Sequence, residues 1–174
     1  MPISEHRDKL INYEVYLSGE RKLGMADITL PKLNYKTGTM SGAGIGGEIS
    51  MPTIGQMESF EIGIKWRTLN SDISVLLTPE SHDLDIRGAN QNYDAGTGKI
   101  ITERVKVNVR CVPKSGDLGK FAPAENSDSE NTMEVTYIKV SVNDKMIIEI
   151  DKLNYIHYIN GKDYMEEVRK ALGL

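Results

Sequence analysis

The sequence predicts a mainly β fold: an antiparallel β-sandwich or partly open barrel with one or two short α-helices. Three observations predict this class. Apolar and polar residues alternate with a period of two along most of the chain, turn-type residues separate the alternating segments, and helical periodicity is confined to two short segments. The length of 174 residues fits a single domain, which we expect to span residues 1–174.

The N-terminal part of the chain contains three predicted strands. Residues 12–17 alternate between apolar and polar side chains. Residues 26–30 form a second, short strand that ends at Pro31, because proline cannot donate to a strand ladder. Residues 56–66 form a third strand with one apolar and one polar face, as in a sheet that covers a core. The apolar face of this strand comprises Phe60, Ile62, Ile64 and Trp66.

A short helix and two strands are predicted next. Residues 70–77 are typical of a helix with Asn70 or Ser71 as its N-cap. Residues 82–94 form a weaker strand with a polar end. Residues 99–113 show the clearest alternation in the chain. One face of that strand carries Ile101, Val105, Val107, Val109 and Cys111.

The remaining segments predict a loop, a hairpin and a further strand. Residues 114–131 are rich in glycine, proline and serine, which indicates an exposed loop. Residues 132–142 and 145–151 alternate on either side of two turn-type residues, which predicts a β-hairpin. Residues 153–159 add another strand.

The chain ends in a predicted amphipathic helix. Asp163 followed three positions later by Glu166 has the spacing of a capping box. Gly173 is a typical stop signal at the other end. The apolar residues that recur at helical spacing are Tyr164, Val168, Ala171 and Leu172.

Charge and cysteine content exclude several classes of protein. The formal net charge of −4, from 21 basic and 25 acidic residues, disfavours a protein that grips nucleic acid. The single cysteine, Cys111, excludes an intrachain disulfide and indicates folding in a reducing cytoplasm. No stretch approaches the about 18–20 apolar residues of a membrane span. Residues 1–17 carry charges where a signal peptide has its apolar core.

The glycine-rich stretch at residues 39–50 does not have the features of a phosphate-binding loop. It contains no lysine, and a loop and a strand follow it where a phosphate loop requires a helix. The alternative is a long, mobile loop or a hairpin that becomes ordered when something packs on it. We therefore expect an extended arm at residues 32–56, hereafter called the arm.

No set of residues predicts catalysis or metal binding. The three histidines, His6, His82 and His157, lack the spacing of a helical metal pair. Cys111 lies in the apolar phase of its strand, as a core residue does. Carboxylates two apart occur on predicted strands, which solvated strand faces carry routinely. We expect no enzyme activity, no catalytic residue, no cofactor and no metal.

The two ends of the chain carry a family resemblance. DITLPKLNYKTGTMSGAGIGGEISM at 27–51, followed by MESFEIGIKW, resembles the opening half of the major tail tube proteins of contractile-tailed bacteriophages. Residues 133–174 are similar to that family's ending: a Tyr-x-Lys strand, a tight turn, an acidic-apolar strand, Asn-Gly-x-Asp and Arg-x-x-Leu-Gly-Leu. The motif positions are Pro31, Tyr137, Lys139, Glu149, Asp151, Asn154, Asn160, Gly161, Asp163, Arg169, Leu172, Gly173 and Leu174. Two departures are Asn143-Asp144, where the family often has Asn-Gly, and the long loop at 114–131.

The resemblance implies a structural protein of tail-tube type. Members of the family form hexameric rings in which the sheets of the subunits join into one inner β-barrel, and the rings stack into a tube inside a sheath. The implied partners are further copies of the chain, the sheath protein, the baseplate and tail terminator proteins, and DNA that passes through the lumen without specific binding. The implied location is the cytoplasm of the producing bacterium, and then the virion tail or a tail-like particle.

Two alternatives remain open at this point. The tube of a phage-tail-like bacteriocin, which carries no genome, belongs to the same family. A small-ligand-binding or hydrolytic β-barrel belongs to another class and requires a convergent pocket of polar groups, which the strand pattern does not show.

The expected contact residues follow from the arm and the polar strand faces. We expect the arm to be disordered in the monomer and to fold onto a neighbouring copy. Its contact residues are Leu33, Tyr35, Met40, Ile45, Ile49 and Met51. The polar face expected to line the lumen carries Ser59, Glu61, Glu134 and Thr136. Lys65, Lys106 and Lys139 do not fit an acidic or neutral lining; they are candidates for contact with the sheath or the neighbouring subunit, and the sequence alone does not assign them.

Overall fold

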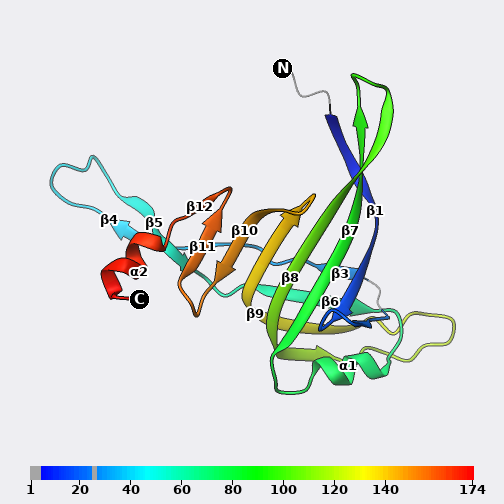
Figure 1. Cartoon of the computed structure of the whole chain (residues 1–174). Coiled ribbons are helices and arrows are strands. Elements are labelled where there is room, and N and C mark those ends of the chain that lie inside the picture. Colours follow the sequence, from blue (N-terminus) through cyan, green and yellow to red (C-terminus); the bar gives the residue numbers. More distant parts are fainter. Residues whose placement is uncertain (1–4, 25–26) are drawn as a thin grey trace.

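The computed structural model describes residues 5–24 and 27–174 (Figure 1). Within these ranges the chain forms a ten-stranded antiparallel sheet, a two-stranded sheet and two short helices. The strands are β1 (Glu5–Leu17), β2 (Arg21–Lys22), β3 (Asp27–Thr29), β4 (Tyr35–Met40), β5 (Ile49–Met57), β6 (Glu61–Trp66), β7 (His82–Asp94), β8 (Lys99–Asp117), β9 (Ser129–Val142), β10 (Lys145–Asp151), β11 (Ile156–Ile159) and β12 (Lys162–Asp163). The helices are α1 (Ser71–Leu76) and α2 (Glu166–Leu172).

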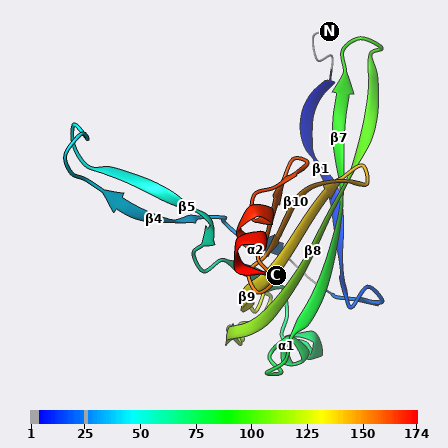
Figure 2. The same cartoon turned by 60° about the vertical axis from the view of Figure 1, so that its left-hand side comes forward.

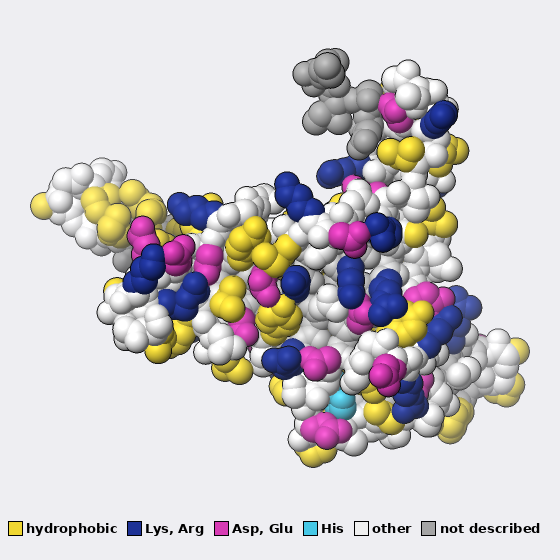
Figure 3. All heavy atoms as spheres, in the orientation of Figure 1, with side chains coloured by type: hydrophobic (Ala, Val, Ile, Leu, Met, Phe, Trp, Pro, Cys, Tyr) yellow, Lys and Arg dark blue, Asp and Glu magenta, His cyan; other side chains and the backbone are white. Residues whose placement is uncertain are grey.

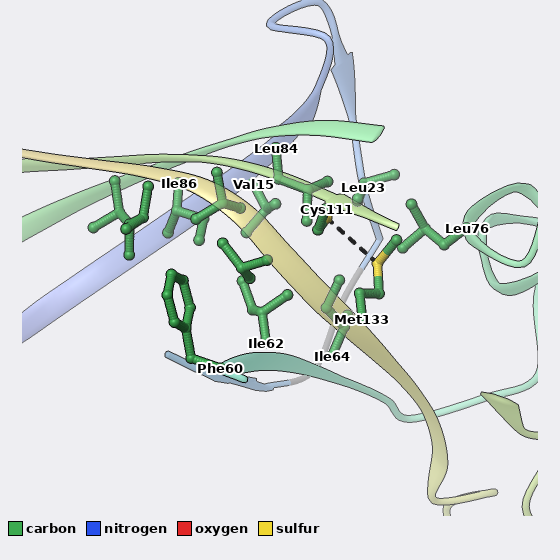
Figure 4. Close-up of a cluster of buried hydrophobic side chains, with 14 of the residues drawn as sticks. Val15, Leu23, Phe60, Ile62, Ile64, Leu76, Leu84, Ile86, Cys111 and Met133 are labelled. Carbon is green, nitrogen blue, oxygen red and sulfur yellow. Dashed lines mark hydrogen bonds between the residues drawn. The ribbon is translucent and has the colours of Figure 1, made fainter. Parts of the chain in front are cut away.

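The long strand β9 folds the main sheet over on itself. The strand order is β12-β11-β10-β9-β8-β7-β1-β2, and β9 also pairs with β6, which pairs with β3. The first half of β9 pairs with β6 and its second half pairs with β10. A register shift in the β8–β9 ladder leaves Thr136 as an extra residue between Val135 and Tyr137, and such bulges bend a strand. The resulting two layers enclose the core (Figure 4).

The core confirms the predicted apolar faces. Phe60, which directly precedes β6, is fully buried, as are Trp66 of β6 and Cys111 of β8. Figure 4 shows side chains of β6 facing those of β1, β7 and β8 across the core. An apolar groove of about 260 Å³ remains between Leu10 of β1 and Leu30 beyond β3. Within the described residues no ladder joins β1 to β3, so the fold is a partly open barrel and not a closed one.

Predicted strand 56–66 is wrong as a single element. Strand β5 ends at Met57 and β6 begins at Glu61. Between them the Glu58 N–H bonds back to the carbonyl of Asn34, and the Phe60 carbonyl accepts from the Val135 N–H. The chain therefore changes partner strands at this point, while its period-two pattern continues through the break.

Other boundaries differ from the prediction because backbone pairing is not visible in composition. The predicted loop 114–131 is shorter, since β8 continues to Asp117 and β9 begins at Ser129. Strand β7 pairs along its whole length with β8, so it is not weak. Strand β11 begins only at Ile156, since the preceding residues form a turn.

The hairpin between β9 and β10 has the predicted turn. Asn143 and Asp144 both have positive φ, 48° and 64°, as the two-residue turn between twisted strands requires. The Asn143 side-chain oxygen accepts from the Arg104 N–H at 3.0 Å, and the Asn143 N–H donates to the Arg104 carbonyl at 2.8 Å. The turn is thus tied to the neighbouring strand β8.

The helices confirm one predicted cap and correct the other. Asn70 caps α1, since its side-chain oxygen accepts from the Asp72 N–H at 2.9 Å. The N-cap of α2 is Met165, without a side-chain cap bond, so the predicted capping box from Asp163 to Glu166 does not form. Gly173 ends α2 in the left-handed conformation, as predicted.

The apolar face of α2 is not buried: the helix contains no buried residue. Neither helix in the described ranges is long and apolar enough to cross a membrane.

Candidate assembly interface

The arm is a hairpin that projects from the body of the molecule (Figure 2). Strands β4 and β5 pair with each other, with Met40 opposite Ile49 and Gly38 opposite Met51. Every residue of β4 is exposed, and five large apolar side chains of the two strands are between 42% and 64% exposed: Tyr35, Met40, Ile49, Met51 and Ile54. A lone two-stranded sheet is only marginally stable in water. The arm therefore presents apolar surface that gains stability when a partner covers it.

The expected contact residues of the arm occupy three different positions. Met40, Ile49 and Met51 are exposed on the paired strands, and Ile45 lies in the connection at the tip. Tyr35 lies at the root, where its hydroxyl bonds to His157 Nε2 at 2.9 Å. Leu33 packs against the core of the body. The arm has the hairpin form, and its ordering on a neighbouring copy stays a prediction.

The main sheet has open edges at both ends of its strand order. Strand β2 pairs only with Tyr16 and Leu17, which leaves the outer edge of the preceding part of β1 without a ladder partner among the described residues. At the other end, β12 covers only two residues of β11. The side chains of Leu10 and Ile11 are half exposed beside the β1 edge. Unpaired strand edges are templates for pairing with another chain.

The main sheet has a polar face opposite the core, defined here by the side of β7 and β8 that carries Asp85, Arg87, Lys106, Asn108 and Arg110. Basic and acidic side chains are interspersed across the part of the molecule where β7 to β10 lie (Figure 3). The buried carboxylate of Asp85 accepts from Arg87 Nε at 2.9 Å and from Asn108 Nδ2 at 3.2 Å, and lies 3.5 Å from Lys106 Nζ. Arg110 pairs with Asp83 at 3.0 Å. Neighbouring strands thus neutralise one another's charges.

Three of the four residues expected to line a lumen lie together at the β6–β9 ladder, where they form a second polar cluster. Glu61 pairs directly opposite Glu134 in the β6–β9 ladder, and the Ser59 hydroxyl donates to Glu134 at 2.5 Å. Two lysines that the sequence analysis missed neutralise these carboxylates: Lys114 pairs with Glu61, and Lys152 with Glu134 at 2.9 Å. Lys114 lies in β8 and Lys152 in the turn after β10, and neither position had a sequence signal beyond its polar side chain. Thr136 is separate and donates to the Arg110 carbonyl at 3.2 Å.

The electrostatic surroundings of Glu134 favour its charged form. Burial raises the pKa of this carboxyl, but the bonds from Ser59 and Lys152 and the charges of Lys152 and Lys114 together outweigh burial. The pKa of Glu134 therefore lies below its ordinary value. The cluster carries balanced charge at neutral pH.

Several family-motif residues form turns and local ties. The Asp151 carboxylate accepts from the N–H groups of Leu153 and Asn154 at 2.9 and 3.0 Å, which folds the turn before β11. Asn160 and Gly161 have φ of 47° and 93° in the turn between β11 and β12. Pro31 lies just beyond β3.

Motif residues on the polar face are tied in pairs. The Tyr137 hydroxyl donates to Glu149 at 2.7 Å, and Glu149 pairs in register with Lys139. Burial, together with Glu149, raises the pKa of Tyr137 well above its ordinary value. This tyrosine therefore remains a neutral donor at neutral pH.

Asp163 and Arg169 hold the C-terminal segment together. The Asp163 carboxylate accepts from the N–H of Met165 at 2.9 Å and from Arg169 Nη2 at 2.6 Å. Arg169 also donates to the Tyr155 carbonyl at 2.6 Å. Burial raises the pKa of Asp163, but these donors outweigh it and hold the pKa below its usual range. Leu172 is exposed near the end of α2.

The residues with catalytic potential are not assembled into a site. Cys111 is fully buried, and burial raises the pKa of its thiol to about 12, so it is no nucleophile at neutral pH. In the part of the chain that the structure describes, no three His, Cys, Asp or Glu side chains are grouped to hold a metal ion. His82 and His157 lie in different strands and contact different neighbours.

Sequence comparison finds relatives along nearly the whole chain. The family model described as phage tail tube protein FII matches residues 7–173. The chain is 30% identical over 173 residues to the tail tube protein of Escherichia phage P2, covering 95% of this chain and 96% of that protein. It is 26% identical over 179 residues to the major tail tube protein of Serratia phage KSP20, with the same coverage.

Solved structures share the fold at low sequence identity. A protein from the PVC sheath/tube terminator of an extracellular contractile injection system matches with a TM-score of 0.54, 16% identity, and coverage of 78% of this chain and 97% of the other. A protein from the PVC sheath-tube complex matches with a TM-score of 0.52, 18% identity, and coverage of 74% and 87%. Because the family model matches nearly the whole chain and a relative is 30% identical to it, this chain belongs to the phage tail tube protein FII family.

Proposed function

We propose that this chain is the structural subunit of the inner tube of a contractile tail, and that it acts by assembly and not by catalysis. Copies join head to tail into hexameric rings, and the rings stack into a hollow tube. The observation that carries the proposal is the projecting arm, which exposes a row of large apolar side chains outside any core. A monomer gains nothing from such a surface, whereas an assembly covers it.

The open strand edges support ring formation. The edge of β1 and the edge at β11 and β12 lie at opposite ends of the strand order. Two different surfaces that pair head to tail close into a ring when the rotation between subunits permits. Strand pairing across the boundary would satisfy the exposed N–H and C=O groups. The arm then provides the second kind of contact, between rings or between neighbours.

The polar face supports a lumen lining. Cations of this face are paired with carboxylates, as Arg87 is with Asp85, and the cluster at the β6–β9 ladder is paired in the same way, as Lys152 is with Glu134. A phosphate backbone binds tightly only where uncompensated lysine and arginine side chains are clustered. A wall of mutually neutralised charges lets DNA pass without holding it. Lys65 and Lys139 have no carboxylate partner among the described ion pairs and remain candidates for contact with the sheath or a neighbour.

The partners follow from the family assignment. Structures that share this fold come from a sheath-tube complex and from a sheath/tube terminator. By that analogy we expect this chain to contact a sheath protein, a tail terminator and a baseplate. The subunit would accumulate in the cytoplasm of the producing bacterium and end in the virion tail.

The test uses the tip of the arm. Ile45→Asp places a charge in the connection between β4 and β5, far from the core, and Ile45→Val is the matched control. Negative-stain microscopy and size-exclusion chromatography of the purified chain should show rods or rings for the wild type and for Ile45→Val. Ile45→Asp should keep the same circular dichroism spectrum and form neither. Full-length tubes from Ile45→Asp would remove the arm from the mechanism, and a wild-type chain that stays monomeric even with a baseplate present would contradict the proposed function.

A further inference from the structure

The root of the arm is held by the C-terminal end of the chain. The Tyr35 hydroxyl, at the start of β4, shares a hydrogen bond of 2.9 Å with Nε2 of His157 in β11. The two rings meet edge to face with centroids 5.4 Å apart. His157 is buried although the arm strand beside it is exposed. The contact therefore joins the first residue of the arm hairpin to a rigid strand of the main sheet.

A second contact holds the other strand of the arm. Gly55 of β5 has a φ of +66°, and a Cβ built there would overlap the Met165 sulfur and lie 2.7 Å from its Cγ. Met165 is 3% exposed, so its thioether fills the space above the Gly55 backbone. Glycine is required twice over, by the left-handed backbone and by the approach of Met165. The other glycine on a paired strand of the arm, Gly38, has open space around its Cβ position.

The C-terminal segment is built to keep Met165 in place. Asp163 accepts from the Met165 N–H, and Arg169 ties α2 to Asp163 and to the Tyr155 carbonyl. Helix α2 itself buries no side chain, so it adds little to the core. The residue it starts from, Met165, is instead the one that packs on the arm. This arrangement gives a role to the motif residues Asp163 and Arg169.

We infer that residues 156–172, from β11 to α2, are a clamp that sets the direction of the arm, and that Met165 and His157 are positioning residues for tube assembly. This inference rests on the proposed function of the arm. Leu33 and Met57 pack on the core where the arm begins and ends. Beyond them, the Tyr35–His157 hydrogen bond and the packing of Met165 at Gly55 hold the hairpin against the C-terminal segment. A pre-oriented arm meets its partner without first losing orientational freedom, which favours association.

The test compares two glycines of the same hairpin. Gly55→Ala places a methyl group against Met165, whereas Gly38→Ala adds the same methyl in open space. Both variants should keep the emission of Trp66, which lies in the core away from the arm. Gly38→Ala should polymerise at the wild-type rate, and Gly55→Ala about tenfold more slowly, with faster amide exchange throughout residues 35–57. Equal polymerisation and equal exchange for the two variants would overturn the clamp.

Two further variants separate the clamp from backbone strain at Gly55. Met165→Ala removes the packing without touching the arm backbone and should also slow polymerisation. Because both changes remove one contact, the double variant Gly55→Ala/Met165→Ala should be no slower than the slower single variant. Multiplied effects would show that the two residues act independently. If Gly55→Ala does not fold, Tyr35→Phe tests the other contact: it should speed amide exchange in β4, and unchanged exchange would count against the clamp.

The outcomes also distinguish the clamp from the proposed function. A wild-type chain that forms no tubes contradicts the function. The clamp alone is contradicted if the wild type and Gly38→Ala form tubes and Gly55→Ala forms them just as fast, with no faster amide exchange.

Discussion

Replacing Asn131 with leucine should lower the free energy of unfolding by about 2–3 kcal/mol. Asn131 lies in β9 with no exposed surface, and its side-chain oxygen accepts from Trp66 Nε1 at 2.8 Å. Its Nδ2 donates to the Ile73 carbonyl of α1 at 3.4 Å, a long bond that contributes less. Leucine has the same branching at Cγ and the same number of side-chain heavy atoms, so the change removes both bonds without opening a cavity.

The magnitude follows from the group left behind. Trp66 is 1% exposed, so its indole N–H cannot form a hydrogen bond with water once the Asn131 oxygen is removed. Leaving this buried donor without an acceptor lowers the free energy of unfolding by about 1–3 kcal/mol. The carbonyl of Ile73 adds a smaller loss, and the extra apolar surface of leucine offsets part of the sum. For a chain of this length the melting temperature should fall by about 5–10 °C.

The assay is urea unfolding of the monomeric subunit followed by circular dichroism for the wild type, Asn131→Leu, Trp66→Phe and the double variant. Since Trp66 is the only tryptophan, its emission gives a second probe for the first two proteins. Removing both partners leaves no orphaned N–H, so the double variant should lose about 1–3 kcal/mol less than the sum of the single losses. Strictly additive losses, or an Asn131→Leu variant as stable as the wild type, would refute the reasoning.

Two further outcomes follow from buried titratable groups. Iodoacetamide at pH 8 should leave Cys111 unmodified in the native chain and label it in urea, because burial raises the thiol pKa to about 12; rapid native labelling, read by mass spectrometry, would contradict the buried position. Burial lowers the pKa of His157 below its ordinary value of 6.5, although the charge of Asp163 opposes this shift. As the pH falls below 6.5, His157 is therefore protonated in the unfolded chain before it is protonated in the folded one. Stability should therefore fall from that pH down through the folded pKa, and His157→Gln should show a smaller loss in urea midpoint between pH 7.5 and 5; equal losses would show that His157 does not titrate in this way.

Strand faces were predictable because side-chain direction along a strand is a local property. The alternation at residues 99–113 placed Val107, Val109 and Cys111 in the core, where the structure has them. The break between Met57 and Glu61 was not predictable, because the pattern of side chains continues while the backbone changes partners. The cap of α2 was misplaced because Asp163 bonds to Met165 and Arg169 instead of acting as the cap residue.

The candidate interface was predictable only in part. Ser59, Glu61 and Glu134 were expected on one polar face and do lie together. The lysines that neutralise them lie elsewhere in the chain, Lys114 in β8 and Lys152 in the turn after β10. Pairing between such residues depends on strand register, which a polar pattern does not specify.

By itself the sequence determined the class of fold, the apolar faces of the strands, the tight turn at Asn143-Asp144 and the family, because these depend on local residue patterns. Only the tertiary structure decided that the glycine-rich stretch connects the strands of a hairpin and that Met165 packs on Gly55. It also decided that Asp85 contacts both Arg87 of its own strand and Lys106 of the next. Such contacts join residues that are distant along the chain, and they exist only once the whole sheet has its register.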